Sequence, residues 1–139
     1  MSEGKEDKME KVEFAKVFAE AQAAAEVAFQ EAKPVPIALQ SSGLNEGFDW
    51  NKPYDVISDG VCGFAWVNVY VDGRSKVAKV MKEFGLRSDY MGGYNFWASD
   101  VAPSARSSQS MQRKEAACGA FAKVLRDYGF EAYVGSRMD

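Results

Sequence analysis

Residues 61–71, with the sequence VCGFAWVNVYV, alternate strictly between two kinds of side chain. One set is aliphatic and comprises Val61, Ala65, Val67, Val69 and Val71; the other is mostly aromatic or polar and comprises Cys62, Phe64, Trp66, Asn68 and Tyr70. A period of two places alternate side chains on opposite faces of a β-strand. We therefore expect a strand here whose aliphatic face lies on the core.

Three other segments have the period of a helix. Between about residues 9 and 32, apolar residues recur every three or four positions, which predicts an amphipathic helix that ends before Pro34. A second helix is expected after Asp72, and a third is expected over about residues 109–128. Gly85 and Gly129 are the expected stops of these two helices, and FEAYV at 130–134 is predicted to form the last strand.

An internal repeat relates the last two helices, because VAKVMKEFGL (77–86) and FAKVLRDYGF (121–130) align position by position. Between them, Gly92-Gly93 predicts a hairpin that pairs residues 86–91 with residues 94–99. The resulting order predicts an α+β fold with the ferredoxin-like split βαβ arrangement, an antiparallel sheet with two helices on one face. The amphipathic N-terminal helix would precede this core.

The two parts of the chain differ in charge. Residues 1–59 hold 6 Lys and Arg against 12 Asp and Glu, whereas residues 60–139 hold 11 against 8. We interpret 1–59 as an acidic N-terminal helical arm with an extended connector from residue 33, and 60–139 as the ferredoxin-like domain. The apolar residues of the connector predict that it packs against the body; they are Ile37, Leu39, Phe48, Trp50 and Tyr54.

Composition narrows the function classes. The chain has no histidine, CxxC spacing, GxSxG motif or Walker loop, so the familiar hydrolases and metalloenzymes lose their usual residues, and no cofactor or metal is expected. No apolar run approaches the roughly 20 residues of a membrane-spanning helix, and the charged N-terminus is unlike a signal peptide. We therefore expect a cytosolic protein with no membrane partner, whose Cys62 and Cys118 are buried, reduced thiols.

The aromatic side of the predicted sheet is the first candidate site, with Trp66, Asn68, Asn95, Trp97 and Tyr133. Aromatic residues on two central strands resemble the RNA-recognition motif, in which such rings stack on bases. The segment GGYNFWAS lacks the basic opening residue of that family's signature, which argues against RNA as the partner. Three alternatives stay open: the N-terminal arm or a second subunit covers these residues, they stack on a ligand, or they bind RNA.

The second candidate site lies at one edge of the sheet, at the start of the last helix. The topology gathers there Gln109, Ser110, Arg113, Lys114, Ser136 and Arg137, with Arg106 near. Cations in a first helical turn oppose the helix dipole, and a bound anion would remove that conflict. The alternative is that Arg113 and Lys114 are solvated or pair with Glu115 and Asp139. At the opposite edge, residues 72–76 are interpreted as an ordinary helix start.

Four blocks of sequence carry a resemblance: DGVCGFAWVNV (59–69), GGYNFW (92–97), QSMQRKEA (109–116) and GSRMD (135–139). Together they resemble a family of small uncharacterised proteins encoded by tailed bacteriophages, over about residues 54–139. The resemblance implies a phage setting and the host cytoplasm as the location, and it implies no chemistry.

These observations favour a non-enzymatic phage accessory protein that binds a nucleotide-like anion or a host protein, with counter-defence as one role. The expected partners are a phosphorylated small molecule or a host protein, and a homo-oligomer is expected. One alternative is an enzyme acting on a nucleotide or phosphoester through Asp59, Asp100, Lys114 or Tyr133. The other is a component of the virion or of its assembly.

Overall fold

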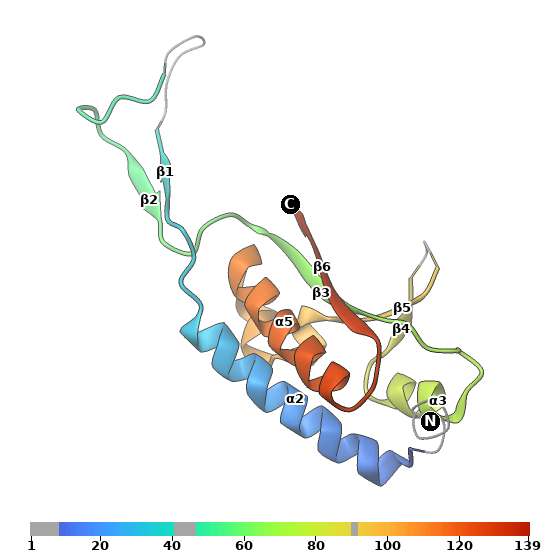
Figure 1. The fold of residues 1–139 in the computed structure, drawn as a ribbon. Coiled ribbons are helices and arrows are strands. Elements are labelled where there is room, and N and C mark those ends of the chain that lie inside the picture. Colours follow the sequence, from blue (N-terminus) through green and yellow to red (C-terminus); the bar gives the residue numbers. More distant parts are fainter. Residues whose placement is uncertain (1–8, 41–46, 90–91) are drawn as a thin grey trace.

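The computed structural model of the chain describes residues 9–40, 47–89 and 92–139. Figure 1 shows a layer of helices on one face of a sheet, with a separate hairpin that extends away from the body. The elements in chain order are α2 (Lys11–Glu31), β1 (Ile37–Leu39), β2 (Asp55–Ile57), β3 (Gly63–Val69), α3 (Lys76–Glu83), β4 (Arg87–Ser88), β5 (Tyr94–Trp97), α4 (Ala98–Val101), the 3₁₀ helix η1 (Pro103–Ser107), α5 (Met111–Asp127) and β6 (Ala132–Met138).

The main sheet has four strands in the order β4-β5-β3-β6, and every neighbouring pair is antiparallel. In the central strand β3, Val67 lies opposite Phe96 of β5 and Val134 of β6. Ala65, Val67 and Val69 are almost fully buried, as the alternation predicts. The α+β class is thus confirmed, with helices packed on an antiparallel sheet.

The predicted hairpin is present, although it is shorter than expected. Arg87 pairs with Asn95 and Ser88 with Tyr94, so the two segments are antiparallel neighbours. Gly92 and Gly93 both have positive φ, which glycine adopts without strain. Residues 90 and 91 of the expected hairpin lie outside the described residues. The second strand ends at Trp97, because the chain enters α4 there.

The sequence repeat corresponds to a structural repeat at the ends of α3 and α5. The Leu86 N–H bonds to the Met81 carbonyl at 3.1 Å, and the Phe130 N–H bonds to the Leu125 carbonyl at the same distance. Gly85 and Gly129 have positive φ and donate to the carbonyls three residues before them. Both helices therefore end in a Schellman motif, which turns the chain into the next strand.

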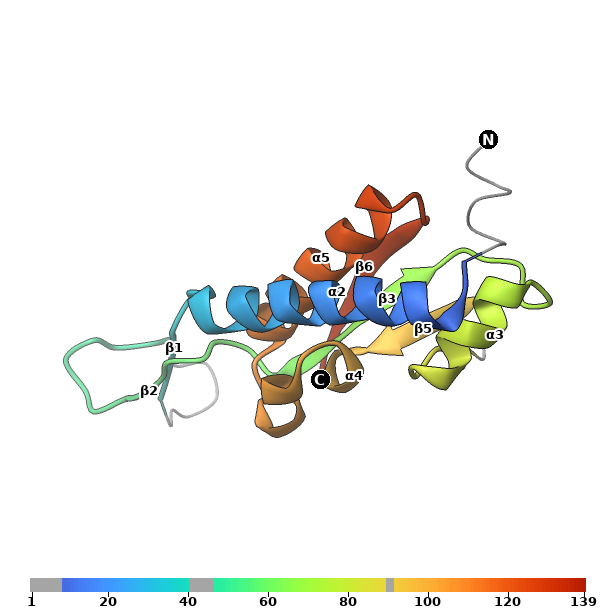
Figure 2. The same cartoon turned by 90° about the horizontal axis from the view of Figure 1, so that it is seen from below.

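The N-terminal helix α2 lies on the aliphatic face of the sheet, beside α5 (Figure 2). The Phe18 ring is 5.5 Å from the Phe121 ring and 5.7 Å from the Phe96 ring, and Phe14 is fully buried. Trp66 and Trp97 lie on the other face, as predicted, and of the alternatives left open for them the one in which α2 covers them is wrong. The aliphatic face attracts α2, because α3 has only eight residues and lies at one end of the sheet, as Figure 2 shows.

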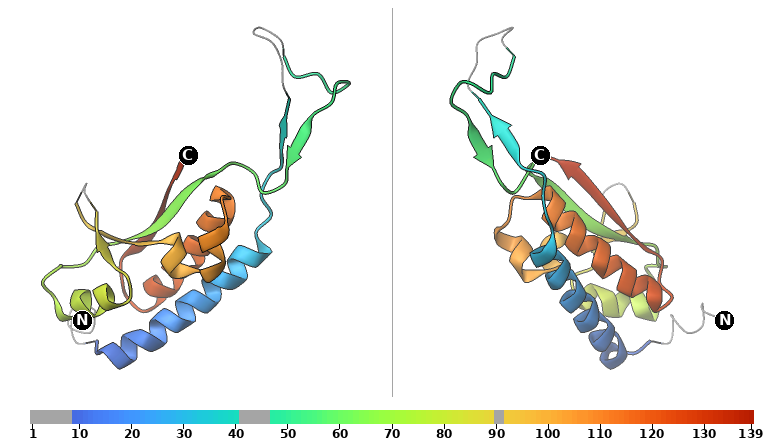
Figure 3. Two further views of the ribbon diagram at one scale, coloured as in Figure 1. Left: turned by 180° about the vertical axis from the view of Figure 1, so that it is seen from behind. Right: turned by 60° about the vertical axis from the view of Figure 1, so that its left-hand side comes forward.

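The connector also differs from the expectation: Val35 and Asp59 near its ends bond to α5, but its described aromatic residues stay away from the body. β1 and β2 pair antiparallel and form a two-stranded hairpin that projects from the end of α2, as both views of Figure 3 show. Phe48, Trp50 and Tyr54 contact one another at ring distances of 4.5–5.4 Å and yet stay exposed. Their apolar surface packs within the hairpin and is only partly removed from water.

Neither cysteine takes part in a disulfide, as expected. Cys118 is buried in α5, whereas Cys62 is exposed, which corrects the expectation that both are buried. Cys62 directly precedes β3, and its side chain is exposed at the end of that strand. Among the described residues, no helix has the length and apolar character needed to cross a membrane.

Candidate functional site

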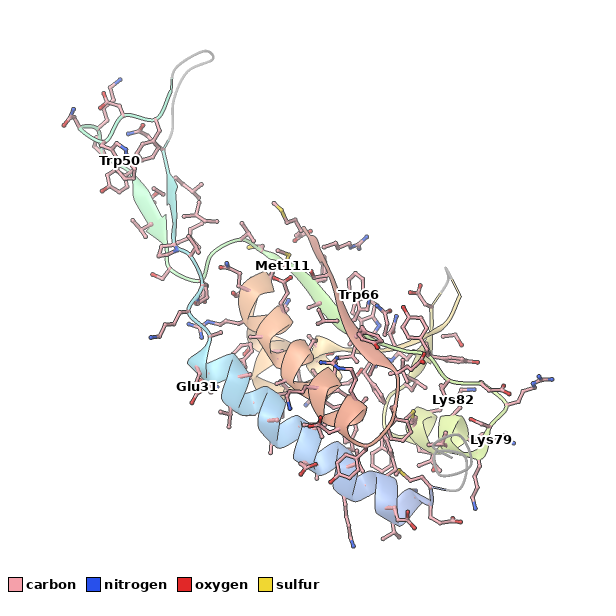
Figure 4. The ribbon with its side chains drawn as sticks, in the orientation of Figure 1. Glu31, Trp50, Trp66, Lys79, Lys82 and Met111 are labelled. Carbon is pink, nitrogen blue, oxygen red and sulfur yellow. The ribbon has the colours of Figure 1, made fainter. Side chains whose placement is uncertain are left out.

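The face of the sheet opposite α2 and α5 carries no helix of the described chain, and we call it the open face. Its side chains come from three strands: Phe64, Trp66, Asn68, Asn95, Trp97 and Tyr133. Trp66 lies opposite Trp97 with 5.8 Å between the ring centroids, and Asn68 lies between Asn95 and Tyr133. Figure 4 shows Trp66 beside β3 and β6, on the far side from α2, and Trp50 on the distant hairpin.

A glycine in the edge strand shapes the open face. Gly135 lies opposite Trp66, and a Cβ atom at Gly135 would be 2.5 Å from Trp66 Nε1. The missing side chain therefore lets the indole ring approach the backbone of β6 closely. Asn95 is 5% exposed, and its Nδ2 donates to Asp89 at 3.4 Å. Asn95 thus contributes to the structure of this face more than to its accessible surface.

The open face leads into a cavity of about 350 Å³ at the edge of the sheet, which we call the edge pocket. Phe64 and Trp97 supply aromatic walls, and small residues and serines complete the lining. The charged and amide groups around it are Arg87, Arg106, Gln109 and Lys114. None of the described residues that line the pocket is acidic. The pocket therefore combines aromatic rings with three cations.

Each of the three cations has a partner that fixes its position. Lys114 Nζ donates to the Gly63 carbonyl at 3.0 Å and lies 5.5 Å from the centre of the Phe64 ring. Arg106 Nε donates to the Ser99 carbonyl at 3.2 Å, and Arg87 lies 3.5 Å from Asp100. Carbonyl partners leave the formal charges of Lys114 and Arg106 uncompensated. Donors on both groups stay available to a ligand, since an ammonium has three and a guanidinium five.

The start of α5 is built differently from what the sequence suggested. Ser110 is the N-cap: its Oγ accepts from the Arg113 N–H at 3.3 Å and donates to the Asp59 carbonyl at 2.7 Å. The Met111 N–H bonds to the Val61 carbonyl. Ser110 is 1% exposed, so it is a buried structural cap. Two of the N–H groups expected to hold an anion thus already have protein acceptors.

Arg113 points away from the edge pocket and toward the C-terminus of α2. Its Nη1 lies 3.1 Å from the Phe29 carbonyl and 3.4 Å from the Ala32 carbonyl, and its Nε lies 3.0 Å from Asp59. A guanidinium at the carbonyl end of a helix interacts favourably with the helix dipole. The conflict at the start of α5 is therefore relieved within the protein. The pairing with Glu115 or Asp139 considered as the alternative is not the one formed.

The remaining predicted residues divide between the two surfaces. The Arg137 guanidinium lies 5.3 Å from the Phe64 ring on the open face, whereas Ser136 donates to Glu115 of α5 at 2.7 Å. Gln109 lines the edge pocket and also a second, more open cavity of about 530 Å³ beside Arg113. Of the residues predicted for this site, Gln109 and Lys114 line the edge pocket; Phe64 and Arg87, which also line it, were not among the predicted site residues.

The second cavity lies between α2 and η1, and the Asp59 carboxylate lines it; a second carboxylate, Glu26, bonds to the lining residues Ser104 and Gln30. Glu26 accepts from the Ser104 hydroxyl at 2.6 Å, from the Ser104 N–H at 3.1 Å and from Gln30 at 3.0 Å. These bonds, that from the Ser104 hydroxyl first, hold the pKa of Glu26 below its ordinary value. An ionised carboxylate beside this cavity makes it a poorer place for an anion than the edge pocket.

No family model, no curated protein and no solved structure matches the chain. Within the described part of the chain, no group of three or more Cys, Asp or Glu side chains is placed to hold a metal ion. Function must therefore be argued from the geometry of the open face and the edge pocket.

Proposed function

We propose that this chain is a non-enzymatic binding protein that takes a nucleotide-like anion in the edge pocket. One observation carries the proposal: Phe64 and Trp97 share a pocket with Arg87, Arg106 and Lys114, and no carboxylate among the described residues lines it. A base can stack on an aromatic ring, and a phosphate can accept charge-assisted hydrogen bonds from the cations. The pocket volume of about 350 Å³ falls in the range of small-molecule sites.

The proposed ligand has a planar end and an anionic end. The centres of the Trp97 and Trp66 rings are 5.8 Å apart, so a base that stacks on Trp97 would lie beside a second indole. Arg106 and Lys114 would bind the phosphate, because neither is neutralised by a carboxylate in the described structure. Arg87 already pairs with Asp100 and would contribute less.

We also propose that the core has the ferredoxin-like arrangement. The strand order β4-β5-β3-β6, with α3 between β3 and β4 and α5 between β5 and β6, supports it. Helix α2 is then an addition to the helical layer. The phage setting and the host cytoplasm remain proposals that rest on the sequence resemblance over residues 54–139.

An enzyme acting on a phosphoester is less well supported. The candidate groups each have a structural contact of their own: Asp59 with Arg113, Asp100 with Arg87, and Tyr133 with the Arg126 guanidinium at 5.3 Å.

A host-protein partner has a separate observation in its favour, because Trp50 and Val56 of the projecting hairpin are more than half exposed. A counter-defence role or a place in the virion would act through that surface, and presence in purified particles distinguishes the latter.

The experiment is a ligand titration followed by tryptophan fluorescence. Trp50→Phe removes the indole of the hairpin, so the signal reports Trp66 and Trp97 of the open face. We expect adenosine monophosphate to quench this signal. Arg106→Ala and Lys114→Ala should each weaken binding about tenfold, since a charge-assisted hydrogen bond is worth about 1.5–3 kcal/mol. The control is Arg74→Ala, whose side chain is 94% exposed at the opposite edge of the sheet.

Inorganic phosphate is the second probe in the same background. It should compete weakly, because it lacks the ring that stacks on Trp97. If adenosine monophosphate at millimolar concentration neither quenches the fluorescence nor raises the melting temperature, the nucleotide proposal is wrong. A protein partner then becomes the leading account.

A further inference from the structure

β6 is an edge strand of the main sheet, with β3 on one side and no strand of the described chain on the other (Figures 1 and 3). It spans seven residues, Ala132–Met138, whereas the strand at the opposite edge, β4, spans two. Edge strands present a row of N–H and C=O groups on which another strand can pair. β6 is therefore the longest unpaired strand edge that the described chain offers.

The hydrogen-bond register tells which groups of β6 face outward. The Tyr70 N–H donates to the Glu131 carbonyl and the Asp139 N–H donates to the Cys62 carbonyl, so 70/131 and 62/139 are hydrogen-bonded pairs of the β3–β6 ladder. Hydrogen-bonded and non-hydrogen-bonded pairs alternate in an antiparallel ladder. Residues 133, 135 and 137 therefore also bond to β3. The N–H and C=O groups of Val134, Ser136 and Met138 consequently point away from the sheet.

The composition of β6 does not protect this edge. Natural edge strands are blunted by proline, by lysine, by bulges or by short length. β6 has no proline and no lysine, and its one charged residue, Arg137, lies over the Phe64 ring. Val134 is 42% exposed and Met138 is 66% exposed on the same strand. An edge of this kind is stable in solution when a second strand covers it.

The sequence of β6 is complementary to itself when two copies run antiparallel around Gly135. In that register Tyr133 lies opposite Arg137 of the second copy, and Val134 lies opposite Ser136. The outward groups of Val134 and Ser136 then bond to each other across the axis. The Arg137 guanidinium, already on the Phe64 ring, meets a second ring in Tyr133 of the other copy, a cation–π arrangement.

We propose that β6 pairs antiparallel with β6 of a second copy, centred on Gly135, so that the protein is a two-fold symmetric dimer with one continuous sheet. An isologous contact of this kind uses the same patch on both subunits and closes after two copies. The two open faces then form one surface, and the Trp66 rings, which lie against Gly135, approach each other at the axis. No residue of β6 lines the edge pocket, so the dimer does not require the proposed nucleotide.

The first test is the mass in solution of the full chain, measured by light scattering during size exclusion. We expect twice the 15.3 kDa chain mass. Val134→Pro removes an outward N–H without breaking a bond to β3, a place where an edge strand tolerates proline. Val134→Lys adds a charge at the same position. Both should raise the dimer dissociation constant at least tenfold, whereas Val27→Lys, at a 56% exposed position of α2, should leave it unchanged.

A wild-type monomer overturns the proposal, and so does a dimer that neither Val134 substitution weakens. The second test fixes the register by disulfide trapping in a Cys62→Ser background. In the proposed dimer, Tyr133 and Arg137 of the second copy form a non-hydrogen-bonded pair. The Cα atoms of such a pair lie about 4.5 Å apart, within reach of a disulfide. The double variant with Tyr133→Cys and Arg137→Cys should oxidise to a covalent dimer. The single variant Tyr133→Cys should not form a covalent dimer, because residue 133 of the second copy is too distant across the axis. Equal cross-linking of the single and double variants would contradict the pairing centred on Gly135.

Discussion

The two faces of the main sheet are made by alternate residues of the same strands, and they differ in burial. On the covered face, Val67, Val69 and Phe96 are at most 1% exposed under α2 and α5. On the open face, Tyr133 is 51% exposed, and Trp66 and Trp97 are half-buried. One step along a strand therefore separates a residue that stabilises the fold from a residue that is available to a ligand.

Truncation on the covered face should give the largest effect. Phe121 is fully buried and its ring lies 5.4 Å from that of Phe96, so Phe121→Ala leaves a cavity at the centre of the core. We expect the free energy of unfolding in urea to fall by about 3–5 kcal/mol. Tyr133→Ala on the open face is the control and should cost less than about 1 kcal/mol. Equal losses for the two variants would contradict the division between the faces.

The same comparison extends to the arginines of the sheet edge. Arg113 bonds to two carbonyls at the end of α2, whereas Arg106 lines the edge pocket. Arg113→Ala should lower the free energy of unfolding by about 2 kcal/mol, because hydrogen bonds from charged groups contribute about 1.5–3 kcal/mol. Arg106→Ala should change it by less than about 0.5 kcal/mol. Thermal melts measure both; an Arg113→Ala variant of unchanged stability would show that its contacts to α2 are not needed.

Two glycines give a smaller pair of effects with opposite signs. Gly135→Ala puts a Cβ against the Trp66 indole and should destabilise the protein by about 1–3 kcal/mol, because the ring must move. Gly119 lies inside α5 with open space around the position of its missing Cβ. Gly119→Ala should therefore stabilise by about 0.5–1 kcal/mol through helix propensity. Chemical denaturation of both variants decides; a stable Gly135→Ala protein would mean that Trp66 adapts freely.

The last comparison concerns the thiols of Cys118 in α5 and Cys62 before β3. Burial raises the pKa of the Cys118 thiol to about 12, with the Glu115 charge adding to the shift, whereas Cys62 is exposed. A thiol reagent at pH 8 should therefore modify one thiol per native chain and two per unfolded chain. Because unfolded Cys118 ionises near pH 9 and the folded thiol near 12, stability should decline across that range. Rapid reaction of both thiols in the native protein would contradict the burial.

Much of the fold could be predicted, because its signals are local. The alternation in residues 61–71 gives the two faces of β3, and Gly85 and Gly129 end α3 and α5 in the same way. The position of α2 could not be predicted, since both faces of the sheet offered apolar partners. The position of α2 depends on the short length of α3, which leaves part of the covered face for Phe14 and Phe18 to fill.

The candidate site was predictable only in part, for a similar reason. The alternation that placed Trp66 on one face also places Phe64 there, so Phe64 was within reach of sequence reasoning. Arg87 was not, because its place depends on the β4–β5 register. Arg113 was misjudged because its acceptors, the Phe29 and Ala32 carbonyls, are more than 80 positions away along the chain. Sequence neighbours give no signal for such contacts.

The contact between α2 and α5 has a consequence for the order of folding during synthesis. α2 leaves the ribosome before α5, and Phe121 of α5, whose ring contacts that of Phe18, is made about one hundred positions later; such non-local contacts slow folding. At roughly 5–20 residues per second, the apolar side of α2 stays without its partner for several seconds. In that interval Phe14 and Phe18 are exposed apolar groups of the kind that makes a nascent chain prone to aggregation. The native core can close only after α5 has also left the ribosome.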